Sequence, residues 1–101
     1  MNRQARYRAT ARGQATARAY ALARYAQRHA IVDALKAVPC EDCGGTFPPE
    51  CMDFDHVRGA KRGEVSDLLL GSLERLLDEI AKCDIICANC HRTRTKARLG
   101  A

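Results

Sequence analysis

Leucines recur at three- and four-residue steps between residues 72 and 82, and this spacing predicts an amphipathic helix. Its apolar face consists of Leu73, Leu76, Leu77 and Ile80. Ser72 stands just before this face and is a good N-cap. Charged residues fill the opposite face, so we interpret this helix as structural and expect it to bury its leucines over the cysteine motifs described below.

Residues 14–37 form a second helix-favouring stretch, rich in Ala and Arg and ended by Pro39. A weak apolar face recurs through Leu22, Tyr25, His29, Val32 and Leu35. We assign His29 to this face and not to a metal, because no other ligand type lies at helical spacing from it. Residues 1–13 are basic and lack an apolar period, so we expect them to be disordered until bound.

Apolar and polar residues alternate between residues 51 and 57, which predicts a short strand. In this strand Asp53 and Asp55 share one face, and Met52 and Phe54 share the other. The β-branched residues 84–87 predict a second strand, followed by a helix from about residue 89 to 97. The expected fold is a small α+β domain over residues 39–101, with a basic, mostly helical extension over residues 1–38.

Charge is distributed unevenly along the chain, although the net charge is only +5. Residues 1–38 carry eight basic groups against one acid, residues 39–90 carry five against eleven, and residues 91–101 carry four against none. Basic ends suit a polyanion and an acidic middle suits cations. We therefore hypothesise that the N-terminal helix binds nucleic-acid backbones. The alternatives are that its arginines only keep the helix soluble, or that it joins two copies in a homodimer.

Four of the six cysteines form two Cys-x-x-Cys pairs, namely Cys40, Cys43, Cys87 and Cys90. Two such pairs supply the four thiolates that a structural Zn²⁺ prefers, although an iron–sulfur cluster or a redox disulfide remains an alternative. Cys51 and Cys83 are interpreted as small buried residues. The chain shows no secretory signal and no apolar run of about 20 residues that would span a membrane. We therefore expect a cytoplasmic protein, where paired cysteines favour a metal over disulfides.

Asp55 and His56 lie between the two cysteine pairs, and His91 follows the last cysteine. The order Cys-x-x-Cys, Asp-His, Cys-x-x-Cys-His-x-x-Arg-Thr resembles the HNH endonuclease family in its zinc-stapled, phage-type form. The resemblance covers residues 40–95. Its matching residues are Cys40, Cys43, Asp55, His56, Cys87, Cys90, His91, Arg94 and Thr95.

The resemblance implies a ββα-metal fold that hydrolyses DNA phosphodiester bonds and leaves 5′-phosphate and 3′-hydroxyl ends. Asp55 and His91 would bind a catalytic divalent cation, Mg²⁺ or Mn²⁺, and His56 would be the general base. The cations suited to holding nucleic-acid phosphates are Lys61, Arg62, Arg92, Arg94 and Lys96. A bacterial host cell and the phage packaging machinery are the setting and the partner that the resemblance implies.

One position departs from the family pattern, because the middle Asn of the HNH name is replaced near Lys82. In the family that Asn braces the loop between the strands, so its absence bears on loop rigidity more than on catalysis. Two other functions remain open. One is a non-catalytic zinc-binding module that grips DNA through its basic ends, and the other is a protein-interaction adaptor. No separate recognition module is apparent, so sequence preference should be weak, and the sequence does not distinguish nicking from double-strand cutting.

Overall fold

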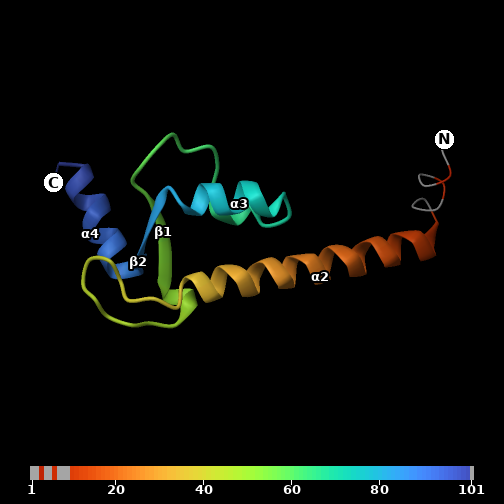
Figure 1. The fold of residues 1–101 in the computed structure, drawn as a ribbon, viewed down its shortest axis with the longest axis horizontal. Helices are drawn as coiled ribbons and strands as arrows, with labels where there is room; N and C mark the ends of the chain where they lie inside the picture. Colours follow the sequence, from red (N-terminus) through yellow and green to blue (C-terminus); the bar gives the residue numbers. More distant parts are fainter. Residues whose placement is uncertain (1–2, 4–5, 7–9, 101) are drawn as a thin grey trace.

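Helix α2, Ala11–Leu35, is the longest element and gives the molecule its elongated shape of 56 × 26 × 22 Å (Figure 1). The computed structural model describes Arg3, Arg6 and residues 10–100. The helix starts three residues earlier than expected because Thr10 caps it, accepting a hydrogen bond of 3.0 Å from the backbone N–H of Gly13. The prediction of disorder is therefore wrong for residues 11–13. Apart from Arg3 and Arg6, residues 1–9 lie outside the described part.

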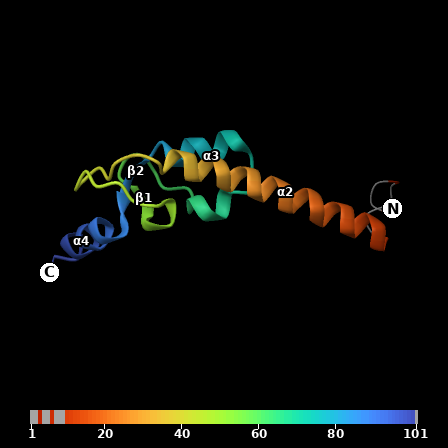
Figure 2. The same ribbon diagram turned by 90° about the horizontal axis from the view of Figure 1, so that it is seen from below.

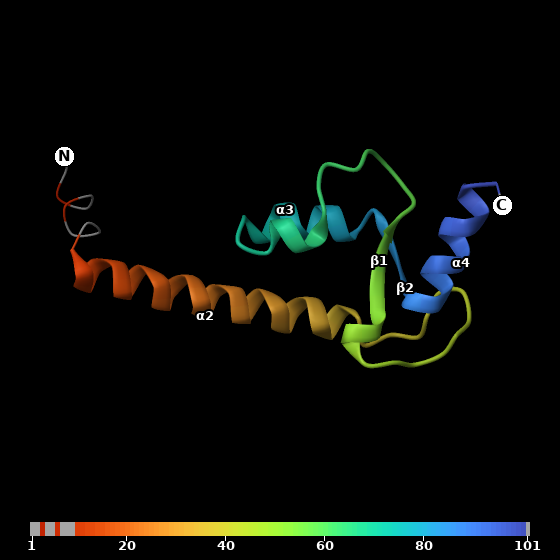
Figure 3. The ribbon, with the colours of Figure 1, turned by 180° about the vertical axis from the view of Figure 1, so that it is seen from behind.

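Strands β1, Met52–His56, and β2, Cys83–Cys87, pair antiparallel, with Met52 opposite Cys87 and His56 opposite Cys83. Both predicted strands are confirmed, with shifts of a residue at their ends. Helix α4, Ala88–Arg98, follows β2 directly and packs against both strands at the end of the molecule far from α2's N-terminus (Figure 3). The sheet therefore has α4 on one face and α2 with α3 on the other.

Helix α3, Leu73–Ile80, begins after Ser72, whose side chain accepts a hydrogen bond from the backbone N–H of Arg75. The predicted helix and its cap are thus confirmed. Leu73, Leu76 and Ile80 of its predicted apolar face pack with Val32 of α2 and the short 3-10 turn η2, Val65–Leu68, whereas Leu77 is 40% exposed. Figure 2 shows α3 beside the C-terminal half of α2. The buried members of this first core are Val32, Val65, Leu69, Leu76, Ile80 and Cys83. The expectation that α3 covers the cysteine pairs is therefore wrong.

A second, smaller core surrounds the cysteine pairs and consists of Cys40, Met52, Ile86 and Cys87. It lies between the loop after α2, the 3-10 turn η1, Pro49–Cys51, and the end of β2. Cys51 is exposed, contrary to expectation, whereas Cys83 is buried as expected. Of the helices in the described part of the chain, none is long and apolar enough to cross a membrane.

Candidate functional site

The two Cys-x-x-Cys pairs meet in space, and their ligand atoms all lie within 4.8 Å of one another. Cys40 and Cys43 come from the loop after α2, Cys87 ends β2, and Cys90 lies in the first turn of α4. A tetrahedral zinc ion with Zn–S bonds of about 2.3 Å separates its sulfurs by about 3.8 Å, so this spacing suits a metal centre. The structure confirms the predicted group of four cysteines as one that could hold a metal ion.

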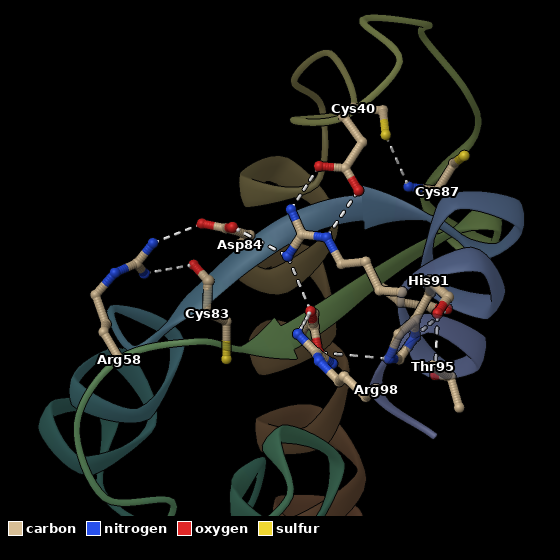
Figure 4. Close-up of polar contacts among 12 residues, drawn as sticks. Cys40, Arg58, Cys83, Asp84, Cys87, His91, Thr95 and Arg98 are labelled. Carbon is tan, nitrogen blue, oxygen red and sulfur yellow. Dashed lines mark hydrogen bonds and ion pairs between the residues drawn. The ribbon is translucent and has the colours of Figure 1, made fainter. Parts of the chain in front are cut away.

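The backbone around the cluster is arranged to support thiolates. Gly44, at φ +73°, completes the tight turn in which its N–H donates to the carbonyl of Cys40 at 2.8 Å. The backbone N–H of Cys87 donates to the sulfur of Cys40 at 3.3 Å (Figure 4), and that of Cys90 donates to the sulfur of Cys87 at 3.5 Å. Although burial opposes ionisation, backbone N–H groups led by that of Cys43 lower the pKa of Cys40 to about 6. The thiolate, which is the form that binds metals, is thereby favoured at this position.

His91 lies between two carboxylates of β1, with one ring nitrogen toward each. Its Nδ1 is 3.0 Å from Oδ2 of Asp53, and its Nε2 is 3.6 Å from Oδ1 of Asp55. Both carboxylates face α4, and the prediction that they share one face of the strand is confirmed. A histidine that binds a metal through one nitrogen commonly donates its other N–H to a carboxylate. Asp53 occupies that second position, so Nε2 is the ring nitrogen that faces Asp55.

Asp55 is buried and is already paired with two arginines of α4. Arg98 donates to both of its oxygens, at 2.7 and 2.6 Å, and Arg94 donates to Oδ2 at 2.9 Å. These contacts, led by that of Arg98, outweigh burial and lower the pKa of Asp55 to about 2. In Figure 4, His91 and Arg98 extend from the same helix into this part of the site. Asp55 is therefore ionised at neutral pH, and Arg98 stands where a cation would approach it.

Arg94 joins the cysteine cluster to Asp55. Its Nε donates to Asp42, between Cys40 and Cys43, at 2.7 Å, and its Nη1 also reaches Asp84 of β2 at 3.1 Å. With its side chain only 20% exposed and bound to three carboxylates, Arg94 is committed within the protein. The same β2 carboxylate, Asp84, holds Arg58 on its other side (Figure 4). Arg94 therefore positions Asp55, and a contact with phosphate would require it to leave these partners.

His56 faces the other side of β1 and contacts α3. Its Nε2 lies 3.1 Å from Oε1 of Glu79, a carboxylate buried to 2% exposure. The backbone N–H of Arg62 donates to the same oxygen at 2.9 Å, and this contact is the main reason that the pKa of Glu79 falls to about 2. No hydrogen bond or ion pair joins His56 to Asp55 or His91 within residues 10–100. The structure thus brings Asp55 and His91 together and places His56 on the opposite face of β1.

Lys82 braces the loop after β1. Its carbonyl accepts hydrogen bonds from the N–H groups of Val57 and Arg58, at 2.9 and 3.1 Å. Its Nζ donates to the carbonyl of Ala60 at 2.8 Å and to Glu79 at 2.9 Å. The loop after β1 is therefore held by both the backbone and the side chain of Lys82.

The remaining predicted phosphate contacts divide between two places. Arg92 and Lys96 are exposed and line a hollow of about 470 Å³ together with Asp53 and His91. Lys61 and Arg62 lie in the loop beside Glu79, where Lys61 pairs with Glu64. Only the first group adjoins the His91 imidazole, so Arg92 and Lys96 have the better position for a bound phosphate.

Sequence reasoning missed the partners that orient the predicted site residues. These partners are Asp42, Asp53, Glu79, Asp84 and Arg98. Asp53 could have been found, because it precedes Asp55 by two positions and so shares its face of the strand. Glu79 and Asp42 carried no such signal, since their partners lie more than twenty residues away.

Within the described part of the chain, one group of three or more potential metal ligands lies close enough together to hold an ion, and it consists of the four cysteines. A cation at Asp55 and His91 would thus have two protein ligands and would complete its shell with water or substrate. Comparison of the chain with family models, curated proteins and solved structures finds no match.

Proposed function

We propose that this protein is a metal-dependent endonuclease of the HNH type that hydrolyses phosphodiester bonds in DNA, and that its four cysteines hold a structural zinc ion. The observation that carries the proposal is the placement of His91, with Nδ1 on Asp53 and Nε2 toward Asp55. This arrangement presents one imidazole nitrogen and one carboxylate oxygen to the same point. Strand β1 supplies the carboxylates and helix α4 supplies the imidazole, and the order of two strands and a following helix is consistent with the ββα-metal fold that we propose.

The donor set at this point suits a hard divalent cation. Mg²⁺ is usually held by one or two carboxylates, with water and substrate phosphates completing its shell. A cation bound there would supply positive charge to the scissile phosphate and to the departing 3′ oxygen. Arg98, whose side chain is 50% exposed at the last turn of α4, would rotate into water to release Asp55.

His56 would take the proton from the attacking water. Glu79 accepts the Nε2–H and so leaves Nδ1 as the basic nitrogen, and its negative charge stabilises the imidazolium that forms. The water oxygen bonds to phosphorus as the bond from phosphorus to O3′ breaks, and the leaving oxygen takes a proton from solvent. Arg92 and Lys96 would hold flanking phosphates in the hollow beside His91.

A plasmid-cleavage assay tests this function. Zinc-loaded protein with added Mg²⁺ or Mn²⁺ should convert supercoiled DNA to nicked or linear forms with 5′-phosphate ends. His91→Ala and His56→Ala should each abolish cutting without changing the zinc content. The third histidine, His29, provides the comparison variant. It packs edge-on against Tyr25 of α2 and lines a cavity of about 370 Å³ with Asp53 and His91, but in the described structure no hydrogen bond or ion pair joins it to Asp53, Asp55 or Glu79. Intact plasmid across several metals and buffers, with zinc bound, would exclude the proposal.

A non-catalytic zinc-binding module that grips DNA is the second candidate, and one observation favours it. Both oxygens of Asp55 are held by arginines, which is how a purely structural carboxylate would be satisfied. The two functions differ in the response to Arg98→Ala. An enzyme should then need less added cation for half-maximal cutting, whereas a structural module should only lose stability.

A further inference from the structure

The half of α2 that extends beyond the first core is strongly basic. Between Ala11 and Leu35 the helix carries four arginines and a single acid, Asp33. Its arginines are Arg12, Arg18, Arg24 and Arg28. The residues of α2 that join the first core, Val32 and Leu35, lie in its last turns. The helix therefore presents positive charge on a rigid arm that the core does not use.

Arg28 has a buried side-chain nitrogen without a hydrogen-bond partner among the described residues. Its Nε is buried, yet it has no hydrogen-bond partner in the described structure, and no ion pair to its side chain is formed there. Burying a polar group of a cation without a partner is costly, so such a group favours the approach of an anion. Arg24, one turn earlier, is held by a 2.9 Å hydrogen bond from its Nη2 to the carbonyl of Gly71. The guanidinium of Arg24 is thus held in place, whereas that of Arg28 has no partner among the described residues.

These two arginines line a shallow groove of about 590 Å³ along α2. The other residues that line it are Tyr20, Ala23 and Gln27. Tyr20 is 69% exposed, so its ring is available at the outer end of the groove. The groove therefore combines an exposed aromatic ring, an amide and two guanidinium groups on one face of a straight helix.

We infer that this groove binds a single-stranded nucleic acid, with a phosphate held by Arg24 and Arg28 and a base stacked on Tyr20. An aromatic platform beside a row of cations is the usual means of binding single strands without sequence preference, because every base has a face that can stack. A membrane surface would need a broad apolar face on the helix, whereas the exposed large apolar side chains of α2, Tyr20, Leu22 and Tyr25, alternate with the arginines Arg18, Arg24 and Arg28. The inference concerns binding alone and holds whether or not the chain cuts DNA.

Fluorescence anisotropy with a labelled mixed-sequence oligonucleotide tests the inference, using the full zinc-loaded chain without added divalent cation so that cleavage plays no part. Arg28→Gln should weaken single-strand binding about tenfold and should lower the slope of log K against log salt by about 0.7, the value for one phosphate contact. Arg28→Lys should retain the salt slope. Tyr20→Ala should weaken binding about fivefold or more, whereas Tyr20→Phe should not.

Arg18→Gln is the matched control, because Arg18 is exposed on the same helix and does not line the groove. If Arg18→Gln and Arg28→Gln weakened oligonucleotide binding equally, the binding would depend on the overall charge of the helix and not on the groove, and the inference would be overturned. Equal affinity for the duplex, with no effect of Tyr20→Ala, would overturn the single-strand assignment. Tighter binding to anionic vesicles or polyglutamate than to the oligonucleotide would identify another class of partner and overturn it as well. If the unmodified protein binds the oligonucleotide in the groove as expected but fails to cut plasmid DNA in the separate cleavage assay, that result would count against the endonuclease proposal and not against this inference.

Discussion

Replacing Cys40 with serine should remove the metal and unfold the part of the protein that carries the candidate site. Cys40 is 2% exposed, and its sulfur accepts the backbone N–H of Cys87, so it lies at the centre of the second core. A serine hydroxyl is a poor replacement for a thiolate ligand of zinc. The other three cysteines would then have an incomplete site.

The magnitude follows from the small size of the second core. Besides cysteines, its fully buried side chains are Met52 and Ile86, and their burial stabilises the folded state by about 3–6 kcal/mol in total. The twelve residues from 37 to 48 lie outside helices and strands, and ordering them costs about 12–24 kcal/mol. A structural zinc ion contributes about 10–16 kcal/mol. With a metal bound, side-chain burial and metal binding together offset the cost of ordering the loop to within a few kcal/mol. Without the metal, residues 37–48 and the strands that they cover cannot stay ordered.

The assay combines zinc stoichiometry with amide NMR spectra. In Cys40→Ser, the bound zinc should fall from one equivalent to none, and the amides of residues 37–56 and 83–98 should lose their dispersion. Cys51→Ser is the matched control, because Cys51 is exposed and lies outside the metal group. If Cys40→Ser kept one tightly bound zinc or an unchanged spectrum, the view that the metal organises this core would be refuted.

Three further predictions follow from the contacts around the site. On the proposed function, Asp53→Ala should weaken binding of the catalytic cation 10- to 100-fold, because His91 loses the hydrogen bond that orients it, and the metal dependence of plasmid cutting would measure this. Asp78→Ala, which removes an exposed carboxylate of α3, should leave the metal dependence unchanged. The pKa of Glu79, about 2 in the fold, is below its ordinary 4.5, so its stabilisation is complete above about pH 4.5 and is lost as the pH falls toward 2. Glu79→Gln should therefore lower the melting temperature near neutral pH, and the difference in melting temperature between the variant and the unmodified protein should become smaller at low pH. A difference that does not change with pH would contradict this reasoning. Leu76→Ala should cost about 2–5 kcal/mol in urea unfolding because Leu76 is fully buried in the first core, and a loss below 1 kcal/mol would show that this core repacks.

Much of the fold could be predicted because the relevant signals are local. The cap at Ser72, the leucine spacing after it and the alternation around Asp53 and Asp55 depend on residues a few positions apart. The start of α2 was misplaced for a local reason as well. Residues 1–13 were expected to be disordered because they lack an apolar period, although Thr10 can cap a helix that begins at Ala11.

What the sequence by itself determined is the set of chemical groups: four thiols in two pairs, a carboxylate beside an imidazole, and basic ends around an acidic middle. Their spacing was sufficient to predict the cysteine cluster, because each pair is local and a tetrahedral ion requires both. Only the tertiary structure decided that Asp53 orients His91, that Glu79 holds His56, and that Arg94 joins Asp42 to Asp55. Those contacts link residues 23 to 52 positions apart, and no local periodicity records which side chains a fold brings together over such distances.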